Sequence, residues 1–392
     1  MSQLAIEGGE PVRRSPYPPW VCMDEEEERA VAEVLRSGRL TSLTSPTVYQ
    51  FESEFARYHG VKHCVAANSG TAAIHMALAA AGVQPGDEVI VPTHTFIGSA
   101  SPILHQGAVP VFADVELDTF NVSRETIKAR LTPRTKAIIV VHINGHPADM
   151  DDILALAQER SLVVIEDAAQ AHGARYNERI VGTMGRMGCF SSWEDKIITT
   201  GGEGGAVITD DDELAASLRL IRHHGEAPVE GQRQYFHLVL GYNYRLSSVH
   251  AAIGLVQFRR LEQYLEARRR NAAYLNQRLA GLAMLVLPYV APYAVHSYYR
   301  YVCKLRTDML SVDIDRFIAA VAVEGVPIAR RYPTPLHRQP VFQNLGYGRE
   351  SCPNADRLAG EQIALLVHPS VGESDLDDAA AAIAKVAEAY AR

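Results

Sequence analysis

The chain contains few cysteines. Only five of the 392 residues are cysteines, and Cys22, Cys64, Cys189, Cys303 and Cys352 are widely spread. Their number is odd and none belongs to a Cys-x-x-Cys pair, which argues against a disulfide framework and against a zinc site. We therefore expect a protein of a reducing compartment that carries no metal.

Long apolar runs are also absent. No stretch approaches the roughly 20 apolar residues that a membrane-spanning helix needs. Residues Met1 to Glu7 lack the basic stretch and apolar core of a secretory signal. These absences predict a cytoplasmic protein with no membrane partner.

Basic charge is scarce and scattered. The formal net charge is −8, and the densest basic run, Arg268 to Arg270, lies in a helical pattern that is typical of a solvated helix face. Nucleic acid is therefore not an expected partner. The 47% of hydrophobic and 21% of charged residues are ordinary for a globular protein, and the length suffices for two domains.

Short Val- and Ile-rich runs alternate with helical patterns between about residues 60 and 210. Such alternation predicts an α/β fold, with a largely parallel sheet and helices on both faces. The predicted strands are 64–67, 88–91, 109–112, 137–141, 162–165 and 206–208, and the predicted helices between them include 71–81 and 150–160.

The two ends of the chain differ from this central part. A proline-rich start leads into an acidic helix start at 24–28. Past residue 250, a long helical segment over 248–282 precedes mixed elements and an Ala-rich helix at 375–390. We interpret these changes as an N-terminal arm with the first helix (1–35), a large α/β domain (36–250) and a smaller C-terminal α+β domain (251–392).

Lys196 lies alone between a buried-looking segment and a glycine-rich turn. A lysine has an unperturbed pKa of about 10.4, so it becomes a nucleophile only where burial or nearby positive charge lowers that value. Most lysines are solvated surface charges, and Lys196 alone predicts little. Its significance comes from residues upstream.

Residues Ser69-Gly70-Thr71 follow a predicted strand and open a helix. Free backbone N–H groups and hydroxyls at such a helix start stabilise a phosphate. Taken alone, the same residues favour ordinary helix capping by Ser69 or Thr71. Ser191, five residues before Lys196, can add a hydroxyl to the phosphate cup or be a plain strand-end serine.

Asp167 comes directly after a predicted buried strand, and ligands of open α/β sheets bind at the carboxyl ends of the strands. A carboxylate there can keep a ring nitrogen protonated, or it can cap the next helix. Gln170 and His172 follow near the same position, either as site residues or as satisfied buried polar groups. Phe96 follows the strand 88–91 and can stack on an aromatic cofactor or belong to the core.

Each of these features is weak alone, but their order along the chain is informative. A phosphate cup, a stacking aromatic, an acid at a strand end and an amine after another strand are the parts that a pyridoxal 5′-phosphate (PLP) site needs. We therefore expect PLP as the cofactor.

With these residues in view, the chain resembles the sugar aminotransferases of the DegT–StrS type, a branch of the fold type I, aspartate-aminotransferase-like PLP enzymes. The similarity runs from about Gly8 to the C-terminus. It implies a mostly parallel seven-stranded sheet flanked by helices, with a smaller C-terminal domain. The matching stretches are 51–52 with 55–56, 68–72, 86–90, 114–115, 145–150, 166–173, 202–205, 241–246 and 332–340.

The resemblance assigns a role to each cofactor residue. Lys196 would bind the cofactor covalently and move the proton between cofactor and substrate carbons. Asp167 would pair with the pyridine nitrogen, and Gln170 would lie near the phenolic oxygen of the ring. The other cofactor contacts would be Phe96 on the ring face, Gly70, Thr71 and Ser191 at the phosphate, and Asn243 reaching the phosphate from the neighbouring subunit of a homodimer. The expected substrate contacts are Arg330, Arg331, Tyr332 and His337.

The sequence departs from the family pattern around the lysine. Ile197 stands where the family often has a polar residue, and Trp193-Glu194-Asp195 replace residues that are more often small or aromatic and neutral. Acids beside a lysine tend to hold it protonated, which would raise its pKa. The alternative is that these residues contact the substrate.

The resemblance implies an aminotransferase that moves an amino group from glutamate or glutamine to a keto-sugar, with a nucleotide-linked sugar as the first expectation and a keto-cyclitol (an inosose) as the alternative. Such reactions serve amino-sugar and antibiotic biosynthesis. Related PLP-dependent sugar dehydratases carry His at the lysine position, so Lys196 argues against that reaction. An inactive regulatory relative is disfavoured because Asp167, Gln170 and Lys196 are present together, although fold alone does not exclude it.

Overall fold

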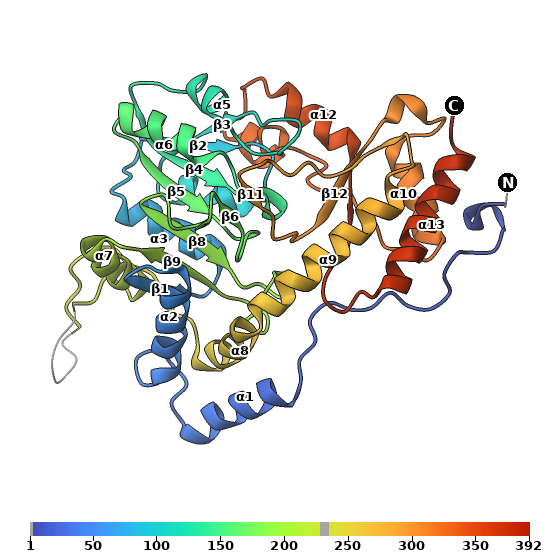
Figure 1. Cartoon of the computed structure of the whole chain (residues 1–392). Coiled ribbons are helices and arrows are strands. Elements are labelled where there is room, and N and C mark those ends of the chain that lie inside the picture. Colours follow the sequence, from blue (N-terminus) through green and yellow to red (C-terminus); the bar gives the residue numbers. More distant parts are fainter. Residues whose placement is uncertain (1–2, 228–234) are drawn as a thin grey trace.

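The computed structural model describes residues 3–227 and 235–392. A seven-stranded sheet with the order β1-β9-β8-β5-β4-β2-β3 forms the centre of the large domain (Figure 1). Its strands are β1 (His63–Ala67), β2 (Glu88–Pro92), β3 (Val109–Ala113), β4 (Thr135–Val141), β5 (Val163–Asp167), β8 (Met187–Ser191) and β9 (Gly205–Thr209).

The pairing of the strands confirms a largely parallel sheet. Every neighbouring pair from β8 through β5, β4 and β2 to β3 is parallel, whereas β9 runs antiparallel to both β1 and β8. The six predicted strands are present, and β8 is an addition that the sequence pattern did not predict.

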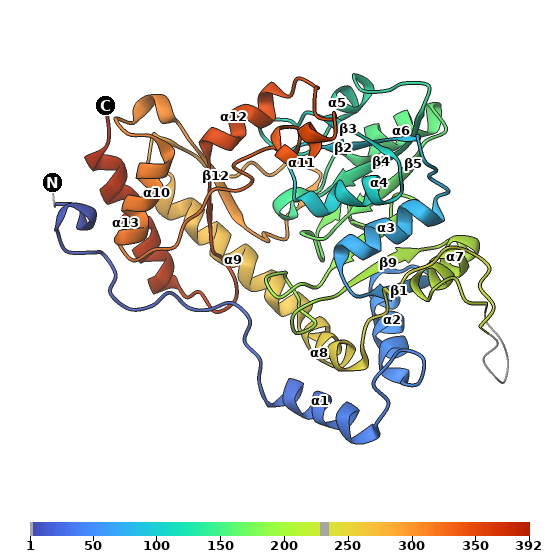
Figure 2. The same ribbon diagram turned by 180° about the vertical axis from the view of Figure 1, so that it is seen from behind.

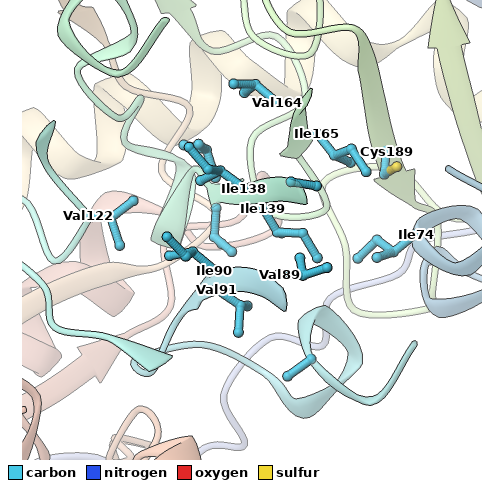
Figure 3. Close-up of a cluster of buried hydrophobic side chains, with 14 of the residues drawn as sticks. Ile74, Val89, Ile90, Val91, Val122, Ile138, Ile139, Val164, Ile165 and Cys189 are labelled. Carbon is cyan, nitrogen blue, oxygen red and sulfur yellow. The ribbon is translucent and has the colours of Figure 1, made fainter. Parts of the chain in front are cut away.

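The apolar runs of the sequence form the core because parallel strands are buried on both faces. Figure 3 shows side chains of β2, β4 and β5 packed together, among them Val89, Ile90 and Ile139, each with no exposed surface. Helices α3 (Gly70–Ala80) and α4 (Ser101–His105) cover one face of the sheet, and α6 (Met150–Glu159) covers the other (Figures 1 and 2). The remaining helices of this domain are α2 (Pro46–His59), α5 (Arg124–Lys128) and α7 (Asp212–Arg222).

The helical segment predicted over 248–282 is confirmed as far as Leu279, but it is interrupted at Arg260. Two helices, α8 (Ser248–Arg259) and α9 (Leu261–Leu279), meet at Arg260, which has φ −93° and ψ 1°. The Arg260 guanidinium forms ion pairs at this break with Asp24 and with acids in the first turn of α1 (Glu25–Ser37). A tertiary contact therefore accompanies a break that local helix propensity does not reveal.

The small domain has its own apolar core. It contains the sheet β10-β12-β13, formed by Leu285–Val286, Tyr301–Leu305 and Gln362–Leu365, with helices α10 (Ile314–Val323) and α13 (Glu373–Ala389). A third small sheet joins β11 (Ala294–Val295) to β6 (Arg175–Tyr176) and β7 (Arg179–Ile180). Helices α11 (Pro340–Asn344) and α12 (Pro353–Glu361) complete the α-helices of the described residues.

Helix α9 joins the two cores. Its residues Leu261 and Leu265 pack in a cluster with Phe51 and Phe55 of α2, whereas its later residues Leu275 and Leu279 pack in the small-domain cluster. The division of the chain at residue 250 stays an interpretation.

Over 3–227 and 235–392, the structure contains no helix whose length and apolar character would let it cross a bilayer.

The N-terminal arm crosses the small domain before α1 begins (Figures 1 and 2). Arg13 forms ion pairs with Asp375 and Asp378 of α13, at 2.7 and 2.9 Å. The predicted acidic helix start is confirmed, because Asp24 caps α1 by accepting the N–H of Glu26 at 2.8 Å. The arm is therefore fixed to the small domain at one end and continues into α1 at the other.

Candidate active site

A cavity of about 780 Å³ lies at the carboxyl ends of β1, β2, β5 and β8. Loops that follow different strands meet there, because the parallel strands end at the same edge of the sheet. The cavity is lined by Asn68, Ser69, Gly70, Thr71, Ile74, Thr95, Phe96, Gly98, Ser99, Asp167, Ala169, Gln170, Ser191, Trp193, Asp195, Lys196, Glu203, Tyr299, Arg331 and Tyr332. Most of the residues that the sequence predicted as cofactor contacts are in this set.

One corner of the cavity is formed by the start of α3 and the end of β8. Ser69 caps α3 by accepting the N–H of Ala72 at 3.0 Å, so the capping alternative is correct for Ser69. The N–H groups of Gly70 and Thr71 belong to the first helical turn, which leaves them without an intrahelical acceptor. A Cβ atom on Gly70 would lie 2.6 Å from the Cβ of Ser191, so only glycine allows α3 to approach β8 this closely. This corner suits a phosphate group.

Asp167 ends β5 and is 4% exposed. One carboxylate oxygen, Oδ2, accepts the hydroxyl of Ser99 at 2.7 Å, and Oδ1 accepts the N–H of Ala169 at 3.1 Å. No helix follows β5 directly, so the helix-cap alternative for Asp167 is wrong. Sequence reasoning missed Ser99, which lies in a short turn (Ile97–Ser99) and belongs to no recognisable motif.

Both polar atoms of the Gln170 side-chain amide form hydrogen bonds. Its Oε1 accepts the N–H of Asn144 at 2.9 Å, and its Nε2 donates to the Oη of Tyr332 at 2.7 Å. His172 instead lies in the core against Phe190, is 1% exposed, and has its pKa lowered to about 3 by burial. His172 is therefore a buried polar residue that does not line the cavity, but it is not a satisfied one, because its Nδ1 has no hydrogen-bond partner among the described residues.

Phe96 is 59% exposed and lines the cavity, so the core alternative for this residue is wrong. A large apolar ring that stays exposed beside a cavity offers a surface on which a ligand can stack. Gly98 permits this position of the ring, because a Cβ atom on Gly98 would lie 3.0 Å from Phe96. Trp193, which sequence reasoning did not assign to the cofactor, also lines the cavity.

The pKa of Lys196 is lowered from its ordinary value, mainly by burial and also by the positive charge of Arg331. Tyr332, Asp167 and Asp195 act in the opposite direction but do not outweigh burial. The expected effect of an adjacent acid is present at Asp195, but the net pKa shift has the opposite direction because burial dominates. Asp195 is engaged in an ion pair with Arg300, and Glu194 lies exposed on a different groove of the surface. Ile197 is buried in the apolar cluster around Phe55.

The predicted substrate contacts separate into two groups. Arg331 and Tyr332 line the cavity, and Arg331 donates to the Oη of Tyr332 at 3.2 Å. Arg330 forms an ion pair with Asp315 at 3.1 Å and does not line the cavity. His337 has no exposed surface, contacts the Oγ1 of Thr93 through Nδ1 at 2.7 Å and is likewise outside the cavity wall, so the structure does not place it in contact with substrate.

Asn243 is exposed and does not line the cavity of its own chain. Its carbonyl accepts the side-chain N–H of Asn68 at 3.2 Å, and Asn68 is part of the cavity wall. The residues that line the cavity fit PLP, because the Gly70–Ser191 corner, the Asp167 carboxylate, the Phe96 ring and the Lys196 amine all face one space.

The family model of the DegT/DnrJ/EryC1/StrS aminotransferases matches residues 21–384. The chain belongs to this family. Its members are PLP-dependent, so the protein is a PLP-dependent aminotransferase. The predicted fold type, activity and cofactor are thereby confirmed.

Two curated relatives match almost the whole chain. A pleiotropic regulatory protein of Geobacillus stearothermophilus is 39% identical over 364 residues, which is 92% of this chain and 94% of the relative. The GDP-perosamine synthase of Caulobacter vibrioides is 39% identical over 368 residues, which is 93% of this chain and 96% of the relative.

Solved structures agree with the sequence matches. An aminotransferase of Psychrobacter cryohalolentis has a TM-score of 0.90 and 35% identity, with 96% of this chain and 100% of that chain covered. Spr1654 of Streptococcus pneumoniae, solved in a PLP form, has a TM-score of 0.89 and 26% identity, with 96% of this chain and 99% of that chain covered.

Proposed function

We propose that this aminotransferase of the DegT/DnrJ/EryC1/StrS family transfers an amino group from glutamate or glutamine to a nucleotide-linked keto-sugar in a cytoplasmic pathway of amino-sugar or antibiotic biosynthesis. The main support is the meeting of Lys196, Asp167 and the start of α3 in one cavity. The similarity to a GDP-perosamine synthase supports a nucleotide-linked acceptor.

The residues of the cavity divide the chemistry among them. PLP, when bound, supplies an electron-withdrawing ring that makes the carbon next to the transferred nitrogen acidic. Burial favours the neutral amine of Lys196, which can accept the proton from one carbon and return it to the next. Asp167 would keep a proton on the ring nitrogen, and Phe96 would cover one ring face. Gly70, Thr71 and Ser191 would hold the phosphate.

Arg331 offers a positive charge to the substrate. Its guanidinium carbon lies 4.9 Å from the ring centroid of Tyr332 and 5.5 Å from that of Tyr299. Within residues 3–227 and 235–392 it forms no ion pair with a carboxylate, because the nearby Asp195 is taken by Arg300. We infer that Arg331, with the Tyr332 hydroxyl, contacts an anionic group of a substrate.

A homodimer with shared active sites is part of the proposal. Asn243 is exposed beside the cavity wall without lining the cavity, which is consistent with a role in a neighbouring subunit's site. Sedimentation velocity should give a species of twice the chain mass of 43.0 kDa. A monomer at micromolar concentration would contradict the shared site.

Product analysis tests which class of keto compound accepts the amino group. The purified holoenzyme, incubated with glutamate or glutamine and a panel of nucleotide-linked 3-keto and 4-keto hexoses and inososes, should aminate a nucleotide-linked sugar, as detected by mass spectrometry. Amination of an inosose alone would replace the proposed acceptor by the cyclitol alternative. The same panel with Arg331→Gln should show KM raised by about tenfold or more for the substrate whose anionic group it binds.

A further inference from the structure

The structure contains a buried cation that the proposed chemistry does not use. Arg268 of α9 has no exposed surface, and its Nη1 donates to the carbonyls of Tyr298 and Tyr299, each at 3.3 Å. Its Nε and Nη2 are buried without a hydrogen-bond partner among the described residues, and it pairs with no carboxylate there. Burial lowers the pKa of this guanidinium, and Arg300 adds to the effect. A buried charge without a counter-ion destabilises a fold, so its contacts suggest a functional reason.

Arg268 is stacked on Trp20 of the N-terminal arm. Its guanidinium carbon lies 4.7 Å from the Trp20 ring centroid, a cation–π contact. Tyr264 and His368 each approach the same indole with ring centroids 5.5 Å away. The half-buried indole is therefore contacted by aromatic and cationic groups from α9 and from the segment that precedes α13.

The indole N–H of Trp20 donates to the backbone carbonyl of Lys196 at 2.9 Å. The Lys196 N–H in turn donates to the carbonyl of Trp193 at 2.9 Å. Both the backbone N–H and the backbone carbonyl of Lys196 are therefore hydrogen-bonded. The lysine side chain has four rotatable bonds and must move during transamination, which leaves the backbone as its only fixed point. A residue from the arm thus fixes the starting point of the catalytic side chain.

The amine of the Lys196 side chain lies close to a residue that contacts Arg268. The Lys196 amine lies 4.8 Å from the ring centroid of Tyr299, and the carbonyl of Tyr299 accepts from Arg268. Trp20, Arg268 and Tyr299 therefore form a connected brace that contacts both the backbone and the amine of Lys196. We propose that Trp20 is a positioning residue for the catalytic lysine, and that Arg268 holds Trp20 in place. This inference rests on the proposed role of Lys196.

Trp20→Phe tests the inference, because phenylalanine keeps an aromatic ring for Arg268 but has no N–H for the Lys196 carbonyl. We expect kcat to fall about tenfold, the rate ratio that corresponds to about 1.4 kcal/mol in the transition state, while KM for donor and acceptor changes less than twofold. Tyr17→Phe is the matched control. Tyr17 is also an aromatic residue of the arm, and its hydroxyl donates to a backbone carbonyl, that of Asp375, at 3.4 Å, so its loss should leave kcat unchanged.

A second readout does not depend on turnover. In the cofactor-free protein, the pH dependence of acetylation at Lys196, followed by peptide mass spectrometry, reports the pKa of its amine. Trp20→Phe should move this pKa upward, toward the ordinary lysine value, because a looser backbone admits water around the amine. The thiol of Cys22, the one exposed cysteine among the described residues, lies two positions after Trp20 and reports whether the arm is still docked.

Three outcomes would overturn the inference. One is an unchanged kcat together with an unchanged amine pKa in Trp20→Phe. Another is an equal loss of kcat in Tyr17→Phe. The third is a reaction of Cys22 with a thiol reagent that accelerates as strongly as kcat falls, since that would mean the whole arm has detached. If wild-type Lys196 gains no mass when the holoenzyme is reduced with borohydride, the proposed function itself fails, which separates the two results.

Discussion

Replacing Lys196 with alanine should lower the rate of amino transfer by about 10⁴-fold, the upper end of what one positioned acid–base group contributes. The structure gives the physical reason. Burial lowers the pKa of this amine, and the other ionisable groups on the cavity wall are carboxylates, a tyrosine pair and Arg331. None of these can act as a neutral amine in place of Lys196. The measurement is the single-turnover rate of 2-oxo-acid formation from glutamate or glutamine.

A matched control is available on the large domain. Lys136 is an exposed lysine of β4 that does not line the cavity, so Lys136→Ala should keep wild-type turnover. Borohydride reduction of the holoenzyme should add the mass of the reduced cofactor to the peptide that contains Lys196 and to no other. Full activity in Lys196→Ala, or labelling of a different lysine, would exclude Lys196 as the catalytic residue.

The sequence predicted the sheet well because its signal is local. Apolar runs such as 137–141 are long enough and rich enough in Val and Ile to identify a buried parallel strand. Strand β8 was missed because its residues, Met187-Gly-Cys-Phe-Ser191, contain a glycine and no β-branched run. Gly188 is required there, since a Cβ atom would lie 2.1 Å from the carbonyl oxygen of Gly182. A close approach of two backbones leaves no hydrophobic pattern for sequence reasoning to detect.

Site residues could be predicted where they belong to a sequence motif. They could not be predicted where their role depends on a contact with a residue far away in the sequence. Asp167, Gln170 and Lys196 lie in stretches that carry the family resemblance, and all three line the cavity. Ser99 bonds to Asp167 across 68 residues, and Trp20 bonds to Lys196 across 176 residues. The net direction of the Lys196 pKa shift was mispredicted for the same reason, because burial and the charge of the distant Arg331 outweigh the effect of the adjacent Asp195.

Neutralising Asp167 should have the second largest effect. In Asp167→Asn the side chain keeps its volume and can still accept the hydroxyl of Ser99, so the change removes the charge while the surrounding contacts remain. We expect kcat to fall by about 10² to 5 × 10³-fold, from the roughly 3–5 kcal/mol that losing one partner of a buried ion pair costs. Without a carboxylate, the ring nitrogen would lose its proton and the ring would draw less electron density from the reacting carbon.

Ser99→Ala separates the charge of Asp167 from its orientation. This change keeps the carboxylate but removes the donor at 2.7 Å from Oδ2, so kcat should fall by about tenfold, the low end of the roughly 1.5–3 kcal/mol that one hydrogen bond to a charged group contributes. The ratio of the two losses therefore measures how much of the effect of Asp167 comes from its negative charge. A loss in Asp167→Asn that is no larger than the loss in Ser99→Ala would mean that the carboxylate acts only through its hydrogen bonds, and that it does not hold a proton on the ring.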